Sequence, residues 1–412
     1  MMIDILHLST SDVEGGAARA AYRLHQGLQK LDASSRMLVR ARQSRDEAVI
    51  AEGSILTKLG PPLSSFPLRR YPQRERTMFS AQWFYDAIAP KVKQLNPDII
   101  HLHWICNGFV QIETLAKFNQ PLVWTLHDMW TFTGGCHYAQ DCLGYEKSCG
   151  SCPQLKSNSE RDLSDQTWKR KAKAWQDLNL TIVSPSKWLA QCARNSSLLQ
   201  NVRVEVIPHG LNLQKYQPVD RAVARSILHL PQDKQLILFG AVSSTNDRRK
   251  GFALLSAALQ HLKQLDRDWE LVVFGPANAN HLQDLGFRVH HLGQFHDDIA
   301  LSLVYSAADV TVVSSTQEAF GQVASESLAC ATPVVAFSAT GLLDIVEHKQ
   351  NGYLAEPFAV EDLARGIAWI LEDGDRHQRL STAARHKAER EFSLSTQAKR
   401  YLSLFEELLD KP

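Results

Sequence analysis

The sequence predicts an α/β protein with two doubly wound, Rossmann-like domains. The chain has 412 residues, which is too long for one ordinary hydrophobic core, so two domains are expected. It opens with an apolar strand, a glycine loop and a helix, and the alternation of strands and helices starts again near residue 236. Such alternation is typical of parallel sheets with helices on both faces.

Composition argues against several classes of protein. The net charge is +1 and 22% of the residues are charged, so overall charge does not indicate a nucleic-acid partner. No apolar run reaches the length of a membrane span, and residues 1–10 lack a basic region followed by a long apolar segment. A cytoplasmic protein is therefore expected. The seven cysteines, an odd number, argue against a disulfide framework.

A glycine pair opens the first predicted helix. Residues 2–8 form an apolar strand, and Gly15-Gly16 precede a helix over 17–31. Glycines allow backbone amides to approach a ligand closely. No complete Gly-x-Gly-x-x-Gly is present, so dinucleotide binding is weakly indicated, and a tight turn without a ligand explains the pair equally well.

A segment without periodicity follows a second strand at 37–40. Residues 41–80 collect prolines and arginines, which is typical of a long functional or mobile loop. Its scattered apolar side chains leave open a contact with a membrane surface or a lipid-linked acceptor. A solvated loop folded over the domain is the favoured interpretation.

Two histidines stand at the ends of predicted strands. A helix is expected over 81–95, and strands over 97–104 and 121–126. Ligands of open α/β sheets bind beyond the carboxyl ends of the strands, which is where His103 and His127 lie. A lone histidine is usually structural, so His103 is only a candidate for contact on the acceptor side.

An unusual cysteine-rich insertion covers residues 134–153. Its cysteines are Cys136, Cys142, Cys149 and Cys152. Four thiolates at these spacings suit a tetrahedral structural zinc ion, with His137 as a substitute ligand. Reduced thiols, or two disulfides in an oxidising compartment, are the alternatives.

The rest of the first domain leads to a linker. A basic helix is predicted over 167–178, strands over 180–183 and 204–207, and a serine-capped helix start at 184–188. Residues 208–212 form the turn that follows the last of these strands. We place the domain boundary after residue 212.

The second domain repeats the pattern. Its predicted strands cover 236–240, 270–274 and 288–292, and its predicted helices cover 252–265, 299–307, 360–372 and 375–391, with a last helix over 395–409. An asparagine-glycine pair at 351–352 predicts a hairpin-like turn before a short strand. Three cations, Arg248, Arg249 and Lys250, precede the first of these helices, where they can neutralise a diphosphate. An ordinary solvated turn is the alternative.

The most informative stretch covers residues 314–337, between apolar strands predicted at 310–313 and 333–337. It holds one helix, entered at Phe320-Gly321. The first amides of this helix suit a phosphate, because helix N-termini attract anions. These amides belong to Gly321, Gln322 and Val323.

Two carboxylates flank this helix start. Glu326 lies about one turn further along the helix, where it can accept both hydroxyls of a ribose. Glu318 lies on the preceding loop, exposed toward whatever group extends beyond the phosphates. Two solvated glutamates beside an ordinary amphipathic helix are the alternative.

The full string around these glutamates resembles the nucleotide-sugar signature of retaining glycosyltransferases of the family 4 type, which have the GT-B architecture. Phe320-Gly321 separate the carboxylates, and a small-residue Ala-Cys-Ala-Thr-Pro turn leads into a valine strand. Lys250-Gly251 resembles the family's diphosphate-binding lysine. A Thr-Leu-His-Asp string resembles the segment with its cleft histidine, here His127.

The chain departs from the family pattern in two places. Ala241 stands where the family often has an arginine, and Arg249 is chosen over Arg248 as the diphosphate contact. The turn between the domains has His209 and Asn212 where the family has Asn and Asp.

The resemblance implies transfer of a sugar from a nucleoside diphosphate sugar to a hydroxyl group, with the anomeric configuration retained. Arg249, Lys250 and the helix amides would stabilise the leaving diphosphate with no catalytic metal. Glu318 would hold hydroxyls of the donor sugar and Glu326 the ribose. A diphosphate oxygen would serve as the base, so no protein nucleophile is needed.

The family also implies roles on the other side of the reaction. His127 would contact the donor sugar, and Gly15-Gly16 would lie near the acceptor and the donor phosphates. The acceptor would be a sugar, a sugar phosphate or a lipid-linked glycan in polysaccharide or glycoconjugate biosynthesis. Peripheral contact with the inner face of the membrane stays open.

The implied architecture is two domains facing a cleft. Residues 1–212 would bind the acceptor, residues 213–394 would bind the nucleotide sugar, and the last helix, 395–412, would pack back on the first domain. The rival function is a non-catalytic nucleotide-sugar-binding module of a glycan assembly complex. A phosphorylase is disfavoured, because no motif indicates a lysine for pyridoxal phosphate.

Overall fold

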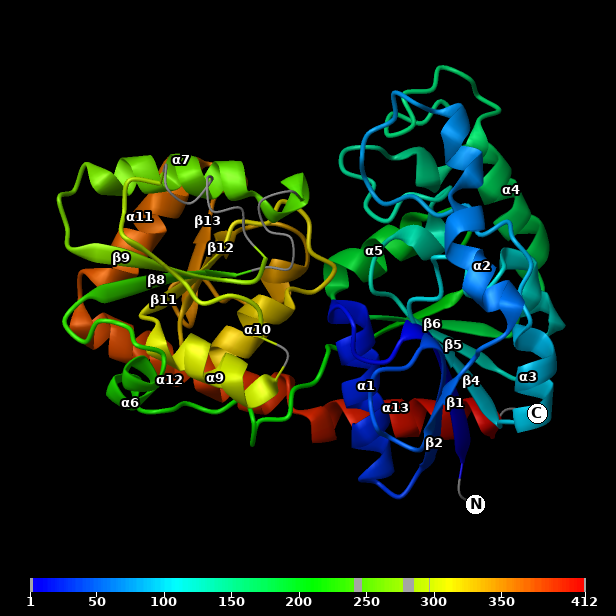
Figure 1. Cartoon of the computed structure of the whole chain (residues 1–412), viewed down its shortest axis with the longest axis horizontal. Helices are drawn as coiled ribbons and strands as arrows, with labels where there is room; N and C mark the ends of the chain where they lie inside the picture. Colours follow the sequence, from blue (N-terminus) through cyan, green and yellow to red (C-terminus); the bar gives the residue numbers. More distant parts are fainter. Residues whose placement is uncertain (1–2, 241–246, 277–284, 296, 411–412) are drawn as a thin grey trace. The chain divides into compact units, whose positions relative to one another are not determined.

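The computed structural model describes residues 3–240, 247–276, 285–295 and 297–410. The chain forms two compact units, one of Met1–Pro208 with Gln397–Pro412 and one of His209–Thr396 (Figure 1). The sequence placed the boundary after residue 212, within the same turn. Each unit has its own sheet and its own core.

The first unit is built on a seven-stranded sheet with the order β3-β2-β1-β4-β5-β6-β7. All of its strand pairs are parallel. The strands are β1 (Asp4–Ser11), β2 (Ser34–Ala41), β3 (Val49–Ala51), β4 (Ile99–Leu102), β5 (Leu122–Thr125), β6 (Leu180–Ser184) and β7 (Arg203–Val206), and the helices are α1 (Gly16–Gln29), α2 (Ile55–Ser64), α3 (Ile88–Leu95), α4 (Leu163–Trp175) and α5 (Lys187–Asn195).

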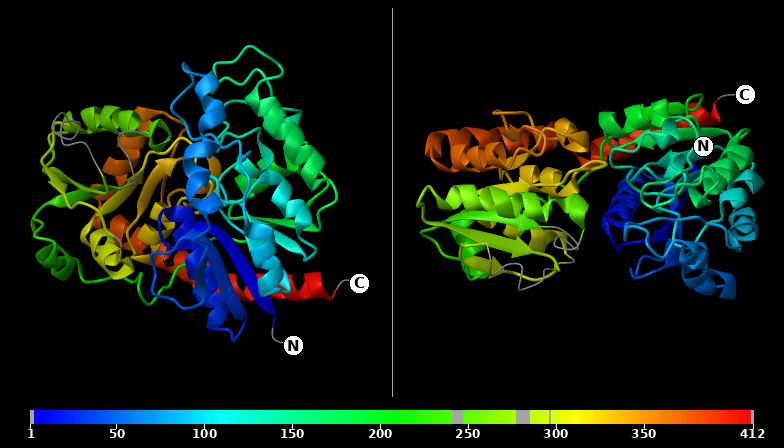
Figure 2. Two further views of the ribbon diagram at one scale, coloured as in Figure 1. Left: turned by 45° about the vertical axis from the view of Figure 1, so that its right-hand side comes forward. Right: turned by 90° about the horizontal axis from the view of Figure 1, so that it is seen from above.

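The last helix, α13 (Leu394–Leu409), completes the core of this unit. Tyr401 and Phe405 are fully buried in one cluster with Ile5 of β1, Ile99 of β4 and Leu24 of α1. The Tyr401 hydroxyl lies 2.7 Å from the hydroxyl of Thr125. In both views of Figure 2, α13 (red) runs along this unit.

The second unit has a six-stranded parallel sheet with the order β10-β9-β8-β11-β12-β13. Its strands are β8 (Gln235–Gly240), β9 (Trp269–Phe274), β10 (Val289–His291), β11 (Val310–Val313), β12 (Val334–Phe337) and β13 (Gly352–Ala355), and its helices are α6 (Arg221–Ile227), α7 (Phe252–Lys263), α9 (Asp298–Ala307), α10 (Gln322–Ala329), α11 (Val360–Leu371) and α12 (Gly374–Glu391). Its core consists of two clusters of buried apolar side chains. One cluster includes residues of α9, α10 and α12, and the other includes residues of α7 and α11. The predicted pair of doubly wound domains is confirmed.

The predicted irregular segment 41–80 contains β3 and α2. Ser54 caps α2 by accepting a hydrogen bond from the amide of Thr57 at 3.3 Å. Gly60 of α2 lies against Gly108, and a Cβ on Gly60 would stand 2.2 Å from the carbonyl oxygen of Gly108. The buried residues of α2 are Thr57, Gly60 and Ser64, and Pro61 and Pro62 lie within it, whereas Ile55 and Leu59 are exposed. The sequence therefore does not identify this segment as a core-facing helix.

The predicted helix over 81–95 is shorter than expected and begins at Ile88. Gln82 has a left-handed backbone, with φ of 42°. Its buried side-chain amide donates to the carbonyls of Ile105 at 3.0 Å and Val110 at 2.6 Å. These bonds hold the residues before Ile88 in a non-helical path.

The predicted hairpin-like turn at 351–352 is wrong. β13 begins at Gly352 and pairs with β12 in parallel, which a hairpin cannot produce. The Asn351 side chain instead closes a turn, since it accepts from the amide of Glu347 at 2.9 Å and donates to the carbonyl of Ile345 at 3.2 Å. In the described residues, no helix is both long and apolar enough to cross a membrane.

Candidate functional site

The cations of the second unit lie on a 3-10 turn, η5 (Arg248–Lys250), between β8 and α7. Gly251 follows it with φ of 68°, and a Cβ there would stand 1.9 Å from the carbonyl oxygen of Ser314. Only glycine fits this close approach. The turn is then tied to the loop after β11, because Thr316 N donates to the carbonyl of Arg249 at 2.8 Å.

Glu318 of that loop meets two of the three cations. Its Oε1 accepts from Lys250 Nζ at 2.6 Å, and its Oε2 lies 3.5 Å from a guanidinium nitrogen of Arg249. Burial would raise the pKa of Glu318, but Lys250 and Arg249 outweigh it and lower the pKa to about 2. Glu318 is therefore ionised, and Arg248 is exposed beside the cluster. Ala241 lies outside the described residues.

The N-terminus of α10 stands next to this loop. Gly321 precedes α10 with φ of 110°, no side chain caps the helix, and a Cβ on Gly321 would stand 2.7 Å from Leu342. Gln322 and Val323 in the first turn are half-buried. The ring of Phe320 is buried and packs against Phe392, so a ligand would meet its backbone rather than its ring.

Glu326 lies in the second turn of α10 and is 5% exposed. Its Oε2 accepts from the hydroxyl of Tyr305 at 2.9 Å. Burial first, and then the Glu326 carboxylate, raise the pKa of Tyr305 well above its ordinary value. Tyr305 thus acts as a fixed donor that orients Glu326.

The two predicted histidines of the first unit are in contact. His103 Nδ1 and His127 Nε2 are 3.1 Å apart. His127 is half-buried, and burial, partly offset by Asp128, lowers its pKa to about 4. His103 is 3% exposed, and its Nε2 lies 3.0 Å from His7 Nδ1. His103 is therefore in contact with both His7 and His127 inside this unit, and its contact with the acceptor stays a prediction.

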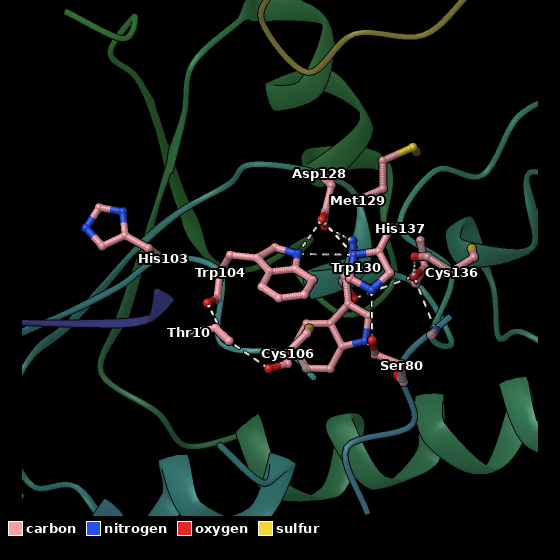
Figure 3. Close-up of polar contacts among 12 residues, drawn as sticks. Thr10, Ser80, His103, Trp104, Cys106, Asp128, Met129, Trp130, Cys136 and His137 are labelled. Carbon is pink, nitrogen blue, oxygen red and sulfur yellow. Dashed lines mark hydrogen bonds and ion pairs between the residues drawn. The ribbon is translucent and has the colours of Figure 1, made fainter. Parts of the chain in front are cut away.

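A hydrogen-bonded cluster of four residues anchors the loop after β5 (Figure 3). Among them, His137 is expected from the sequence only as a substitute zinc ligand, and Ser80, Trp104 and Asp128 are not singled out there. Asp128 Oδ2 accepts from Trp104 Nε1 at 2.9 Å and lies 2.6 Å from His137 Nδ1. His137 Nε2 lies 2.9 Å from Ser80 Oγ. Burial alone would raise the pKa of Asp128, but its partners, His137 first among them, lower it below its ordinary value. The position of Asp128 directly after His127 was the one available signal.

The glycine pair begins α1 as predicted. Gly15 has φ of 88° and precedes the helix, which Gly16 opens, and no side chain caps it. Nearby, the buried carboxylate of Asp12 accepts from the amides of Gln43 and Ser44 at 2.8–3.1 Å. Asp12 was not singled out from the sequence; it ties the loop after β1 to the loop after β2.

The four cysteines of the insertion are neighbours, since Cys142, Cys149 and Cys152 all act on the thiol of Cys136 and raise its pKa together with burial, the largest cause. Within the described residues, its four sulfurs do not form a group of ligand atoms within 4.8 Å of one another, whereas sulfurs on tetrahedral zinc would be about 3.8 Å apart. The insertion would have to close around an ion. Both ring nitrogens of His137 have protein partners, Asp128 and Ser80, so His137 would have to break one of these contacts to act as the substitute ligand. Cys149 Sγ accepts from the amide of Gly134 at 3.1 Å.

Comparisons with known proteins identify the family. The model described as Glycosyltransferase Family 4 matches residues 14–215, and the model described as Glycosyl transferases group 1 matches residues 220–387. A D-inositol 3-phosphate glycosyltransferase of Xylanimonas cellulosilytica is 34% identical over 320 residues, which cover 71% of this chain and 68% of that protein. The chain belongs to the family 4 glycosyltransferases. The relative from Thermobispora bispora is 29% identical over 328 residues, or 76% of this chain and 71% of that protein.

Solved structures give the same fold for this glycosyltransferase. Sucrose-phosphate synthase of Thermosynechococcus elongatus superposes with a TM-score of 0.73 at 22% identity over all of both chains. HepE of Anabaena in complex with UDP-glucose superposes with a TM-score of 0.68 at 18% identity, covering 98% of this chain and all of that one. The fold is therefore GT-B, as the sequence indicated.

Proposed function

We propose that this glycosyltransferase moves a sugar from a nucleoside diphosphate sugar to a hydroxyl acceptor and retains the anomeric configuration. The observation that carries the proposal is the cluster of Lys250, Arg249 and Glu318 beside the uncapped N-terminus of α10. Cations and helix amides together form a site for a diphosphate. HepE, which shares the fold, was solved with UDP-glucose, so UDP-sugars are the first donors to test.

In this proposal the second unit handles the charge that develops on the leaving group. Lys250 and Arg249 stabilise the diphosphate as the glycosidic bond breaks, and the amides of Gly321 to Val323 contribute the helix dipole. Glu318 keeps both cations oriented and accepts hydroxyls of the donor sugar. Glu326, held by Tyr305, accepts the ribose hydroxyls. The acceptor attacks from the face that the diphosphate leaves, with a diphosphate oxygen as base.

The first unit supplies the remaining contacts. His127 contacts the donor sugar, and Gly15-Gly16 lie near the phosphates. Among sugar, sugar phosphate and lipid-linked glycan acceptors, phosphorylated sugars and cyclitols come first, because the matched relatives are named for D-inositol 3-phosphate. We place the reaction in polysaccharide or glycoconjugate biosynthesis, in the cytoplasm or at the inner membrane face.

One experiment tests the proposal directly. Nucleotide sugars are screened by thermal shift, the stabilising donor is incubated with each acceptor class, and products are identified by mass spectrometry and by NMR of the anomeric proton. A product with the donor's anomeric configuration supports the proposal. Donor binding without transfer or hydrolysis would instead indicate a nucleotide-sugar-binding module, and an inverted product would contradict the mechanism.

A further inference from the structure

Three histidines gather inside the first unit, beside the loop that carries His127. His7 of β1 and His101 of β4 are register partners on neighbouring parallel strands, and His103 follows His101 by two residues. Alternate residues of a strand face the same side, so the three side chains lie together. They are 0%, 0% and 3% exposed, and one ligand atom from each lies within 4.8 Å of the others.

The surroundings of this cluster do not explain it as packing. The ring of His101 lies 5.1 Å from that of Tyr401 and 5.5 Å from that of Phe405, and the polar neighbours of the cluster include Ser35, Thr125 and a fourth buried histidine, His25. A buried polar atom costs free energy unless it is hydrogen-bonded. His101 Nδ1 is buried and has no hydrogen-bond partner in the described part of the chain. An orphaned nitrogen beside two further imidazoles points to an ion.

Each imidazole is also held by its other nitrogen. His7 Nε2 lies 3.0 Å from Ser35 Oγ, His101 Nε2 lies 2.7 Å from Thr125 Oγ1, and His103 Nδ1 lies 3.1 Å from His127 Nε2. Histidine ligands of metals characteristically have such an outer partner, which fixes the ring and its tautomer. The three rings are thus already oriented.

We propose that His7 Nδ1, His101 Nδ1 and His103 Nε2 bind one divalent transition-metal ion, with zinc the first candidate. His7 Nδ1 and His103 Nε2 are 3.0 Å apart, and two nitrogens on tetrahedral zinc would be about 3.3 Å apart. Without an ion, one proton lies between these two atoms. When the ion binds, the neutral ring that carried this proton takes it on its other nitrogen, so that both lone pairs face the ion and no proton leaves the cluster. Imidazole ligands suit zinc, copper, nickel and iron.

The ion would determine which ring nitrogen of His127 carries the proton. The relevance of this proton to sugar transfer rests on the proposed function. Once His103 Nε2 binds the ion, His103 carries its proton on Nδ1 and donates it to His127 Nε2. A neutral His127 then carries its own proton on Nδ1. Without the ion, the hydrogen bond between His103 and His127 can run in either direction.

The test uses the full chain with Cys142→Ser and Cys149→Ser, which weakens competition from the cysteine-rich insertion. The protein is stripped with a chelator and titrated with Co²⁺. The proposal expects a single Co²⁺ per chain, with visible d–d absorption, no sulfur-to-cobalt charge-transfer band, and displacement by Zn²⁺. In the same background His101→Gln should weaken Co²⁺ binding roughly tenfold or more, whereas substitution of a half-buried histidine of the second unit, His377→Gln, should not.

A second measurement covers the case in which His101→Gln does not fold. In the cysteine variant labelled with ¹⁵N-histidine, Zn²⁺ should move the signals of His7, His101 and His103 and convert His127 to the Nδ1-protonated form. Failure to bind Co²⁺, or equal binding by folded His101→Gln, overturns the proposal and leaves a hydrogen-bonded histidine network. Loss of sugar transfer with Co²⁺ binding intact would count against the proposed function alone.

Discussion

The two units carry opposite kinds of polar cluster. In the second unit, the half-buried cations Lys250 and Arg249 form ion pairs with the buried carboxylate of Glu318. In the first unit, His103 and its neighbours are buried rings joined through their nitrogens. Burial lowers the pKa of His7 well below its ordinary value and that of His101 to about 3, so these rings are neutral.

This difference indicates a division of labour. The half-buried cations of the charged cluster can exchange an ion pair with Glu318 for one with an anionic ligand, because the ligand replaces one negative partner with another. A buried neutral network cannot rearrange so cheaply, and it holds its outermost ring, His127, in one place. Under the proposed function, the second unit would bind the charged diphosphate and the first would orient a hydroxyl.

Removing a cation should produce the largest effect. In Lys250→Ala, transfer should fall by about 100- to 1,000-fold, because one stabilising group of the leaving diphosphate is lost. Donor affinity should weaken by about 1.5–3 kcal/mol, measured by calorimetry, and Glu326→Ala should weaken it similarly. Arg248→Ala, an exposed neighbour, is the control and should stay near the wild-type values. Unchanged donor affinity in Lys250→Ala would refute the assignment.

Glu318 should make stability depend on pH. Its folded pKa of about 2 lies below the ordinary value of 4.5, so its ionised form stabilises the fold above pH 4.5 and this contribution is lost as the pH falls toward 2. The contribution should be on the order of 2–3 kcal/mol. Glu318→Gln should therefore lose less free energy of unfolding than wild type between pH 5 and pH 2, in urea titrations. Parallel curves for the two proteins would contradict the ion-pair geometry.

A smaller effect is expected from the cysteine-rich insertion, which we still predict to hold structural zinc. Cys149→Ser should lower the zinc content and reduce the midpoint of thermal unfolding, while calorimetry shows unchanged donor affinity in the other unit. Cys330→Ala in the second unit serves as the control for loss of a thiol. Equal zinc in wild type and Cys149→Ser would leave the insertion as a loop with reduced thiols.

The smallest effect should come from added divalent cations. Mg²⁺ or Mn²⁺ should not raise the transfer rate, because Arg249 and Lys250 already supply the positive charge that the diphosphate needs. Initial rates with and without each salt, at constant ionic strength, measure this. A strong increase with either ion would show that the protein cations do not suffice.

The sequence predicts the charged site far better than the histidine cluster, for a physical reason. Glu318 and the first turn of α10 come from one local stretch, and Lys250 precedes a predicted helix, so short patterns are enough. His7 and His101 meet only because β1 and β4 are neighbours in the sheet, and nothing in either strand alone indicates this. The order of strands has to be known first.

The burial of an individual charged residue likewise cannot be predicted from the local sequence pattern. Lys171 belongs to a helix predicted to be basic, yet it is 0% exposed. Its ammonium donates to the carbonyls of Trp130 and Thr133 and lies 3.6 Å from the centre of the Trp130 ring. Those partners come from a different part of the chain, about 40 residues earlier, so a charge count could not reveal them.

The return of α13 to the first unit has a consequence for how the protein is made. A ribosome completes the second unit, His209–Thr396, before it adds Tyr401 and Phe405, which are fully buried in the core of the first unit. Until then Ile5 and Ile99 lack the side chains that cover them. The half of the enzyme that is translated first is therefore the half that finishes folding last.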